Sequence, residues 1–153
     1  MKVRGSYEPE ALEYEVLNDG TAVIRLYENI TPFEEPETDD MPAVSGFEFD
    51  RYTLCRPHTE RLRQQVEVET AAWLEFAKQE EIEELSAEVR KKRNELLYES
   101  DKTQLLDAQV SDKGRATMAA YRQELRDIPE QSRFPYEVKW PECPSPEELI
   151  LPY

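Results

Sequence analysis

Histidine, cysteine and glycine are scarce in this chain of 153 residues, and their scarcity excludes several kinds of site. There is one histidine, His58, and the two cysteines, Cys55 and Cys143, lie far apart, so no ligand spacing for zinc occurs. The four glycines do not form a phosphate-binding loop, and no Gly-x-Ser-x-Gly elbow is present. We therefore predict a protein that is not an enzyme and that has no metal site and no cofactor.

A long hydrophobic run is also missing from the chain. No stretch of about 18 apolar residues occurs, which predicts that there is no transmembrane helix. The residues after Met1 carry no secretory signal, and two distant cysteines are typical of reduced thiols in a cytosolic protein. We expect synthesis in a cytoplasm and no membrane partner.

Acidic residues far outnumber basic ones. The chain has 34 Asp and Glu residues against 19 Lys and Arg residues, for a formal net charge of −15. Phosphate backbones repel such a chain, so we predict no nucleic-acid partner. The one basic run, Arg90 to Arg93, is expected to pair with acids about one helical turn away, such as Glu88 and Glu95. Contact with an acidic partner is the alternative interpretation of this run.

The first part of the chain has the alternation of a β-hairpin. Apolar and acidic residues alternate over residues 11–17, and a second run over residues 22–27 is rich in β-branched residues. Between them, Asp19 and Gly20 tolerate the positive φ that a tight turn requires. We therefore expect two antiparallel strands here.

Two further segments complete the predicted β unit. Residues 31–45 are rich in proline and acids, which is typical of an exposed loop. Residues 46–54 carry regularly spaced aromatic residues and predict a third strand. We expect a small antiparallel sheet of about three strands over residues 1–58, and one of its faces needs cover.

A long helical segment follows the predicted sheet. Residues 59–98 contain no proline and no glycine, and apolar residues recur at helical spacing. His58 or Thr59 is expected to cap this helix. The apolar stripe changes register near residues 79–81, which predicts a shift of the stripe around the helix or a bend. Trp73, the largest apolar residue in the first half of this helix, is expected to lie in the core.

The last third of the chain predicts a helical hairpin. A second helical pattern begins after Ser111 and ends at Ile128-Pro129, because the residue before a proline avoids helical backbone. An extended segment of aromatic residues and prolines follows, and residues 142–153 are expected to form a tail. The predicted fold class is α+β, with an antiparallel sheet, one long central helix and a carboxy-terminal helical hairpin.

Apolar side chains are expected to pack between the two helices of this hairpin. They are Leu96, Leu97, Leu105, Ala120, Tyr121 and Leu125. Phe134 and Trp140 can fold back and close the hairpin. A unit of this size buries little apolar surface, so docking onto another protein would add burial.

Arg122 and Arg126 are four residues apart and share one face of the second helix. Two interpretations fit this pair. In one, the arginines form internal ion pairs with Asp101 or Asp107. In the other, they recognise an acidic or carbonyl-rich surface of a partner.

Short motifs occur in order within residues 93–141. They are Tyr121-Arg122-Gln123, then Leu125-Arg126-Asp127-Ile128-Pro129, then Phe134-Pro135 and Trp140-Pro141. In this order they are specific, and the segment resembles the phage tail assembly chaperone family, also seen as tail fibre assembly-like proteins of prophages. The chain departs from the family pattern at Lys102, where the pattern has tryptophan, and at Leu106, where it has proline.

The resemblance implies a non-enzymatic phage or prophage protein that binds a phage tail or tail-fibre protein during assembly. It implies action in the host bacterial cytoplasm or presence in the virion tail. The expected partner-binding residues are Tyr121, Arg122, Arg126, Phe134 and Trp140. Two other functions stay open, a structural subunit retained in the tail or baseplate and an acidic inhibitor that mimics DNA. The sequence does not distinguish a monomer from a homo-oligomer.

Overall fold

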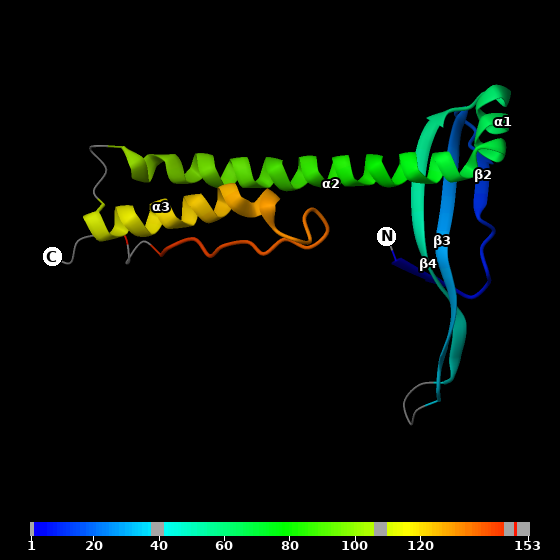
Figure 1. Cartoon of the computed structure of the whole chain (residues 1–153), viewed down its shortest axis with the longest axis horizontal. Helices are drawn as coiled ribbons and strands as arrows, with labels where there is room; N and C mark the ends of the chain where they lie inside the picture. The colour runs from blue at the N-terminus through cyan, green and yellow to red at the C-terminus, as the bar shows by residue number, and fades with distance from the viewer. Residues whose placement is uncertain (1, 38–41, 106–109, 146–148, 150–153) are drawn as a thin grey trace. The chain divides into compact units, whose positions relative to one another are not determined.

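The chain divides into two compact units, Met1–Glu81 and Ile82–Tyr153. The computed structural model describes residues 2–37, 42–105, 110–145 and 149. The first unit contains a sheet and the second contains helices, and each has its own cluster of buried apolar side chains. One helix, α2 (Thr70–Ser100), contributes residues to both units (Figure 1). The α+β fold class is confirmed.

Four antiparallel strands form the sheet of the first unit, in the order β1-β4-β3-β2. Their bounds are Lys2–Gly5 for β1, Leu12–Val16 for β2, Thr21–Glu35 for β3 and Val44–Pro57 for β4. We predicted about three strands, and β1 is the strand that was missed. Its four residues are too few to establish a period of two, and pairing with β4 is what makes them a strand.

The predicted hairpin between β2 and β3 is confirmed. Gly20 has a φ of 82°, in the left-handed region that glycine adopts without a steric penalty. The Asp19 carboxylate accepts a hydrogen bond from the main-chain N–H of Thr21 at 2.9 Å, and this bond lowers the pKa of Asp19. The turn is therefore closed by the residues that its sequence predicted.

The strands β3 and β4 extend further than we predicted. The acidic loop was expected over residues 31–45, but β3 continues to Glu35 and β4 already begins at Val44. Pairing continues along this part of the ribbon, with Thr31 opposite Glu48 and Glu35 opposite Val44. Proline and acids lower the preference for a strand, but ladder hydrogen bonds and the neighbouring strand override that preference.

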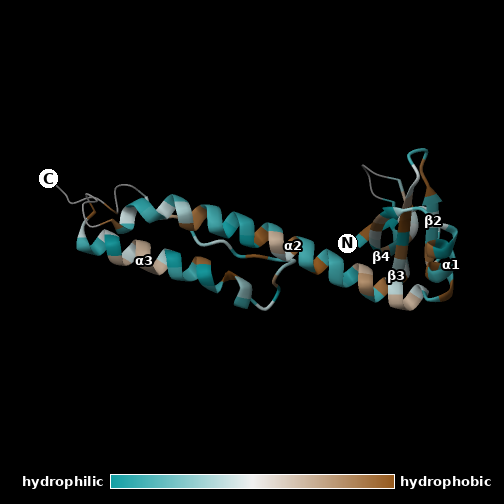
Figure 2. Ribbon diagram, turned by 90° about the horizontal axis from the view of Figure 1, so that it is seen from above, coloured by the Kyte–Doolittle hydropathy of each residue, from teal (hydrophilic) through white to brown (hydrophobic). Residues whose placement is uncertain are grey.

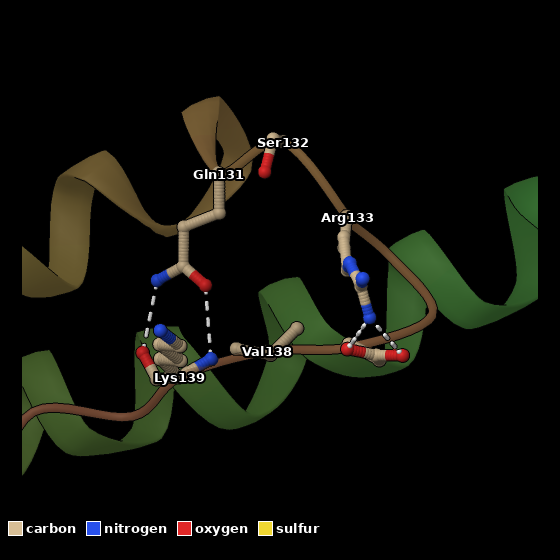
Figure 3. A pocket seen from close by; sticks show the side chains of 6 residues that line it. Gln131, Ser132, Arg133, Val138 and Lys139 are labelled. Atoms are coloured by element: carbon tan, nitrogen blue, oxygen red, sulfur yellow. Dashed lines mark hydrogen bonds and ion pairs between the residues drawn. The ribbon is translucent and has the colours of Figure 1, made fainter.

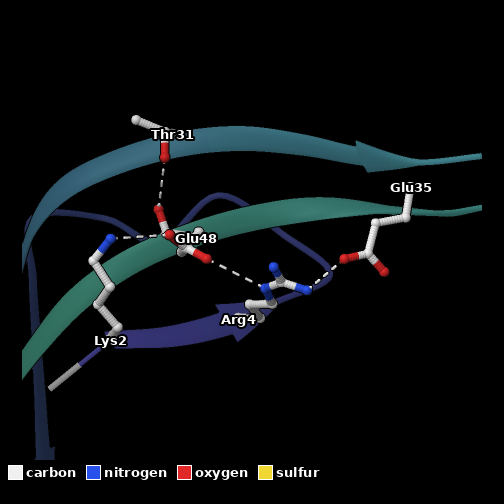
Figure 4. Close-up of polar contacts among 5 residues, drawn as sticks. All are labelled: Lys2, Arg4, Thr31, Glu35 and Glu48. Atoms are coloured by element: carbon white, nitrogen blue, oxygen red, sulfur yellow. Dashed lines mark hydrogen bonds and ion pairs between the residues drawn. The ribbon is translucent and has the colours of Figure 1, made fainter.

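Cations from β1 lie against the acids of this ribbon (Figure 4). Arg4 donates to Glu35 Oε1 at 2.7 Å and to Glu48 Oε2 at 3.3 Å, and Lys2 Nζ lies 3.1 Å from Glu48 Oε1. The Arg4 guanidinium also lies 4.6 Å from the centre of the Phe33 ring. The hydrogen bonds from Lys2 and Arg4 lower the pKa of Glu48. Because these cations pair with its acids, the charged segment can form part of a sheet.

One face of the sheet packs against α1 (Glu60–Val68) and the start of α2. The buried residues of this core are Ile24, Leu26, Leu54, Val66 and Ala77. Trp73 is half-buried and packs against them, as we expected. Thr59 caps α1, because its hydroxyl accepts a hydrogen bond from the Leu62 N–H at 3.0 Å. The two helices therefore supply the cover that the sheet requires.

The single helix predicted over residues 59–98 is interrupted at Glu69, where φ is −114° and ψ is 35°. The Thr70 hydroxyl donates to the Val66 main-chain oxygen at 2.9 Å. Such a bond competes with the helical N–H for the same oxygen, and it bends or ends helices. The predicted change of register near residues 79–81 instead coincides with the boundary between the two units, and α2 continues through it.

The second unit is built on the hairpin of α2 and α3 (Asp112–Asp127), followed by the short 3₁₀ helix η2 (Ile128–Glu130). Ser111 caps α3 by accepting from the Gly114 N–H at 2.9 Å. The buried core residues of this unit are Met118, Tyr121, Leu125 and Ile128. Their spacing of three or four places them on one face of α3, while hydrophilic residues follow much of the rest of both helices (Figure 2).

Two residues expected between the helices lie at the surface instead. Leu105 is 57% exposed, because it follows the 3₁₀ helix η1 (Asp101–Gln104) and has left α2. Ala120 is exposed because it lies off the buried face of α3. The expected tail also contributes to the core, since Leu149 packs against the apolar cluster. A Cβ atom at Gly114 would lie 2.6 Å from the Leu149 main-chain oxygen, so only glycine allows this approach.

Candidate partner-binding site

Arg122 of α3 holds the end of α2. It donates from Nη1 to the Leu97 main-chain oxygen at 2.8 Å and to the Ser100 hydroxyl, and its Nη2 forms an ion pair with Asp101 at 2.8 Å. The Arg122 side chain is only 12% exposed. The last carbonyls of a helix have no partner inside the helix, and α2 has no basic residue in its last turn. Arg122 therefore supplies the missing cation from the neighbouring helix.

The two predicted arginines differ in their surroundings. The pairing of Arg122 with Asp101 is confirmed. Arg126, one turn further along α3, is exposed and forms no ion pair with any residue that the structure describes. Asp107, the other expected partner, lies outside the described residues. Arg122 thus serves the hairpin itself, whereas the Arg126 guanidinium faces solvent.

Phe134 and Trp140 fold back onto the hairpin and pack against its core, as predicted. Each ring lies next to a cation of α2. The Arg90 guanidinium lies 5.4 Å from the centre of the Phe134 ring, and Lys92 Nζ lies 4.4 Å from the centre of the Trp140 ring. Both distances are within the range of a cation–π attraction.

This stacking corrects our prediction for the basic run Arg90 to Arg93. We expected ion pairs with acids such as Glu88 and Glu95, but no member of the run forms an ion pair within the described parts of the chain. Arg93 donates to the Asn94 side chain at 2.9 Å. Aromatic rings brought from more than thirty residues further along the chain replace the local carboxylates, and helix spacing alone does not reveal such partners.

Tyr121 is a core residue of the second unit. Burial raises the pKa of its hydroxyl, and the Cys143 side chain raises it further. Tyr121 therefore belongs to the packed interior of the second unit. Four of the five predicted partner-binding residues, all except Arg126, thus build the unit, and direct contact with a partner remains a prediction for all five.

The segment after α3 forms a tight loop over residues 131–139 (Figure 3). Gln131 bridges it, because its side-chain Nε2 donates to the Lys139 main-chain oxygen and its Oε1 accepts from the Lys139 N–H, both at 2.9 Å. Arg133 forms an ion pair with Glu137 at 2.6 Å, and a hollow of about 890 Å³ lies against this loop. The loop brings Phe134 and Trp140 back to α2.

Sequence reasoning did not single out Gln131 or Arg115. Arg115 donates from Nη1 to the main-chain oxygens of Leu105 at 3.1 Å and Thr103 at 3.4 Å. Both residues bind main-chain atoms that are distant in sequence. No pattern of residue types signals such bonds, because every residue offers the same main-chain oxygen.

No arrangement typical of metal chemistry is present in the described residues. No group of three or more His, Cys, Asp or Glu side chains there could hold a metal ion. In the same parts of the chain, no helix has both the length and the apolar character needed to cross a membrane. The side chains described above are aromatic, cationic and polar, and they pack within the second unit.

The chain was compared with protein families, curated proteins and solved structures. No curated protein and no solved structure gave a significant match to the chain. A protein-family model does match, and its description is phage tail assembly chaperone protein. Lys102 occupies the position at which the family pattern has tryptophan, and it is exposed in η1. Residues 86–145 of this chain, which lie within the second unit, are thus similar to the phage tail assembly chaperone family and connect the chain with phage tail assembly.

Proposed function

We propose that this protein assists phage tail assembly by binding a tail or tail-fibre protein transiently and covering an assembly surface of that protein. The observation that carries the proposal is the family match over residues 86–145, because the matched segment coincides with a unit that has its own apolar core. The protein would act in the host bacterial cytoplasm. Its net charge of −15 favours solubility and opposes self-association.

Within this proposal, the five predicted residues have two different roles. Tyr121 and Arg122 position the hairpin, because both are engaged inside the unit. Arg126 is exposed and contacts the partner directly. Phe134 and Trp140 are half-buried, and the outer parts of their rings add apolar area to the same contact.

The direct test is affinity capture from phage-producing bacterial cells followed by mass spectrometry. The affinity-tagged full chain should enrich a tail or tail-fibre protein over a tagged acidic protein of similar charge. A core variant, Leu125→Asp, should lose the capture because it places a charge in the buried face of α3. The proposal fails if no tail protein is enriched by the wild-type chain.

A structural subunit of the tail or baseplate is the main alternative. Mass spectrometry of purified particles separates the two, since a chaperone is absent from the particle and a subunit is present in fixed copy number. A DNA mimic is less well supported. It would present acids alone on one face, whereas Arg25, Arg56 and Lys78 pair with acids across the first unit.

A further inference from the structure

A stripe of two aromatic residues between two acids runs along the junction of α1 and α2. Glu69, Trp73, Phe76 and Glu80 are spaced by four, three and four residues, which places them on one helix face. The main-chain N–H of Trp73 still donates to the Glu69 oxygen at 3.1 Å, so Glu69 keeps its helical relation to Trp73 despite the break. All four residues belong to the first unit, outside the residues matched by the chaperone family.

One end of this stripe already binds a guanidinium. Arg56 of β4 donates from Nη2 to both carboxylate oxygens of Glu80, at 2.7 and 2.6 Å. Its guanidinium carbon lies 5.7 Å from the centre of the Phe76 ring. An arginine can satisfy a carboxylate and lie against an aromatic ring at the same time, because its charged group is planar. Phe76 and Glu80 thus form a site for arginine that the chain fills itself.

The other end repeats the same elements, but no cation of the described residues pairs with them. Trp73 and Glu69 are four residues apart, as are Phe76 and Glu80, and the Trp73 and Phe76 rings meet edge to face at 5.7 Å. Glu69 is exposed and forms no ion pair with the described residues. A hollow of about 260 Å³ lies between these groups and is lined by Gln65, Glu69, Ala72, Trp73 and Phe76.

An accessible apolar ring forms part of the wall of the hollow. Phe76 lines it and is 48% exposed. A large apolar side chain at such exposure gains free energy when a partner covers it. The net charge of −15 attracts a cationic partner and speeds its approach. A cationic side chain with apolar neighbours would therefore match the charge and the exposed aromatic ring at this hollow.

We propose that this hollow binds an arginine side chain of a partner protein, with the guanidinium against the Trp73 ring and the Glu69 carboxylate. An apolar residue next to that arginine would cover the exposed part of Phe76. The site is independent of the proposed tail-assembly contact, which uses the second unit. It gives the first unit an interaction of its own.

The test uses the full chain labelled with ¹⁵N and two blocked peptides, acetyl-Leu-Arg-Leu-amide and the same peptide with neutral citrulline in place of arginine. The chain has two tryptophans, so each indole N–H gives a separate signal. The Trp73 signal should shift saturably with the arginine peptide, while the Trp140 signal stays in place. The arginine peptide should bind roughly tenfold more tightly than the citrulline peptide, because it adds a charge-assisted bond and a cation–π contact. Equal affinities, or no saturable shift of Trp73, would overturn the proposal.

Two variants with the same loss of charge complete the experiment. Glu69→Gln should weaken the arginine peptide roughly tenfold. Glu34→Gln, an exposed acid of the same unit that does not line the hollow, should leave the affinity unchanged. Equal effects of both variants would mean that only net charge matters, and the assigned site would be wrong. A Trp73 shift that depends on protein concentration without peptide would assign the hollow to a second copy of this chain instead of a partner.

Discussion

Arg122 of α3 donates a hydrogen bond to the main-chain oxygen of Leu97 in α2, at 2.8 Å and across 25 residues of sequence. The same guanidinium holds the Ser100 hydroxyl and the Asp101 carboxylate. One side chain thus completes the end of one helix from the face of the next. The specific motif Tyr121-Arg122-Gln123 therefore has a structural reason for its arginine, apart from any contact with a partner.

Arg122→Ala should destabilise the second unit by about 1–3 kcal/mol, because it removes the hydrogen bonds and the ion pair that the largely buried Arg122 guanidinium forms with Leu97, Ser100 and Asp101. Arg122→Lys should recover part of this loss, since an ammonium group keeps the charge but cannot reach several acceptors as a planar fork does. Urea unfolding followed by the indole N–H signal of Trp140 in the ¹⁵N-labelled chain measures both. Arg126→Ala, at the exposed arginine one turn away, is the control and should leave the midpoint unchanged. Equal effects at both positions would contradict the assigned role of Arg122.

Gly114→Ala provides a test in which two effects have opposite signs. Alanine favours a helix over glycine by about 1 kcal/mol, so a free α3 would become more stable. A Cβ here, however, would lie 2.6 Å from the Leu149 oxygen and 2.7 Å from the Leu149 Cα. We expect loss of the Leu149 contact, seen as faster hydrogen exchange at the Ser111 amide, which donates to the Leu149 oxygen at 2.9 Å. Slower exchange with a higher melting temperature would show that Leu149 does not pack there.

Gln131→Glu should open the loop over residues 131–139. A carboxylate can still accept from the Lys139 N–H, but it cannot donate to the Lys139 oxygen and repels it. The expected cost is about 1–2 kcal/mol, measured by urea unfolding of the second unit. Ser132→Ala, at a neighbouring exposed residue that lines the same hollow, serves as the control. If tail-protein capture depends on this loop, Gln131→Glu lowers it as well, and Ser132→Ala does not.

Tyr27 should titrate late. Its side chain is 7% exposed and donates to Glu13 at 2.8 Å, and burial together with this bond raises its pKa from 10.0 to about 12. A raised folded-state pKa means that the folded protein holds the proton longer than the unfolded chain. Its contribution to stability is therefore complete below pH 10 and is lost as the pH rises toward 12.

Ultraviolet titration of the eight tyrosines detects this late step. Tyr27→Phe should remove the titration step near pH 12 and reduce the loss of stability between these pH values. Tyr7→Phe, the same change at an exposed side chain, should leave the late phase in place. A late phase that persists in Tyr27→Phe would assign it to another residue.

Local patterns predicted the parts of this fold whose causes lie within a few residues. The β2–β3 turn follows from Asp19 and Gly20, whose carboxylate and backbone freedom act on the next residues. The start of α3 follows from its Ser111 cap, and its end follows from Pro129. The buried face of α3 follows from spacings of three and four residues.

Contacts between distant residues account for what those patterns missed. Strand pairing made β1 from Lys2 to Gly5 and extended β3 to Glu35, into the segment expected as a loop. Thr70 fits the helical pattern, but its hydroxyl competes with the helical N–H for the Val66 main-chain oxygen, and the helix breaks at Glu69. Aromatic rings from the returning segment replaced the glutamates expected beside Arg90 and Lys92. Sequence patterns did not reveal these partners, because the free energy gained on burying apolar surface does not depend on how far apart the contacting residues are in the sequence.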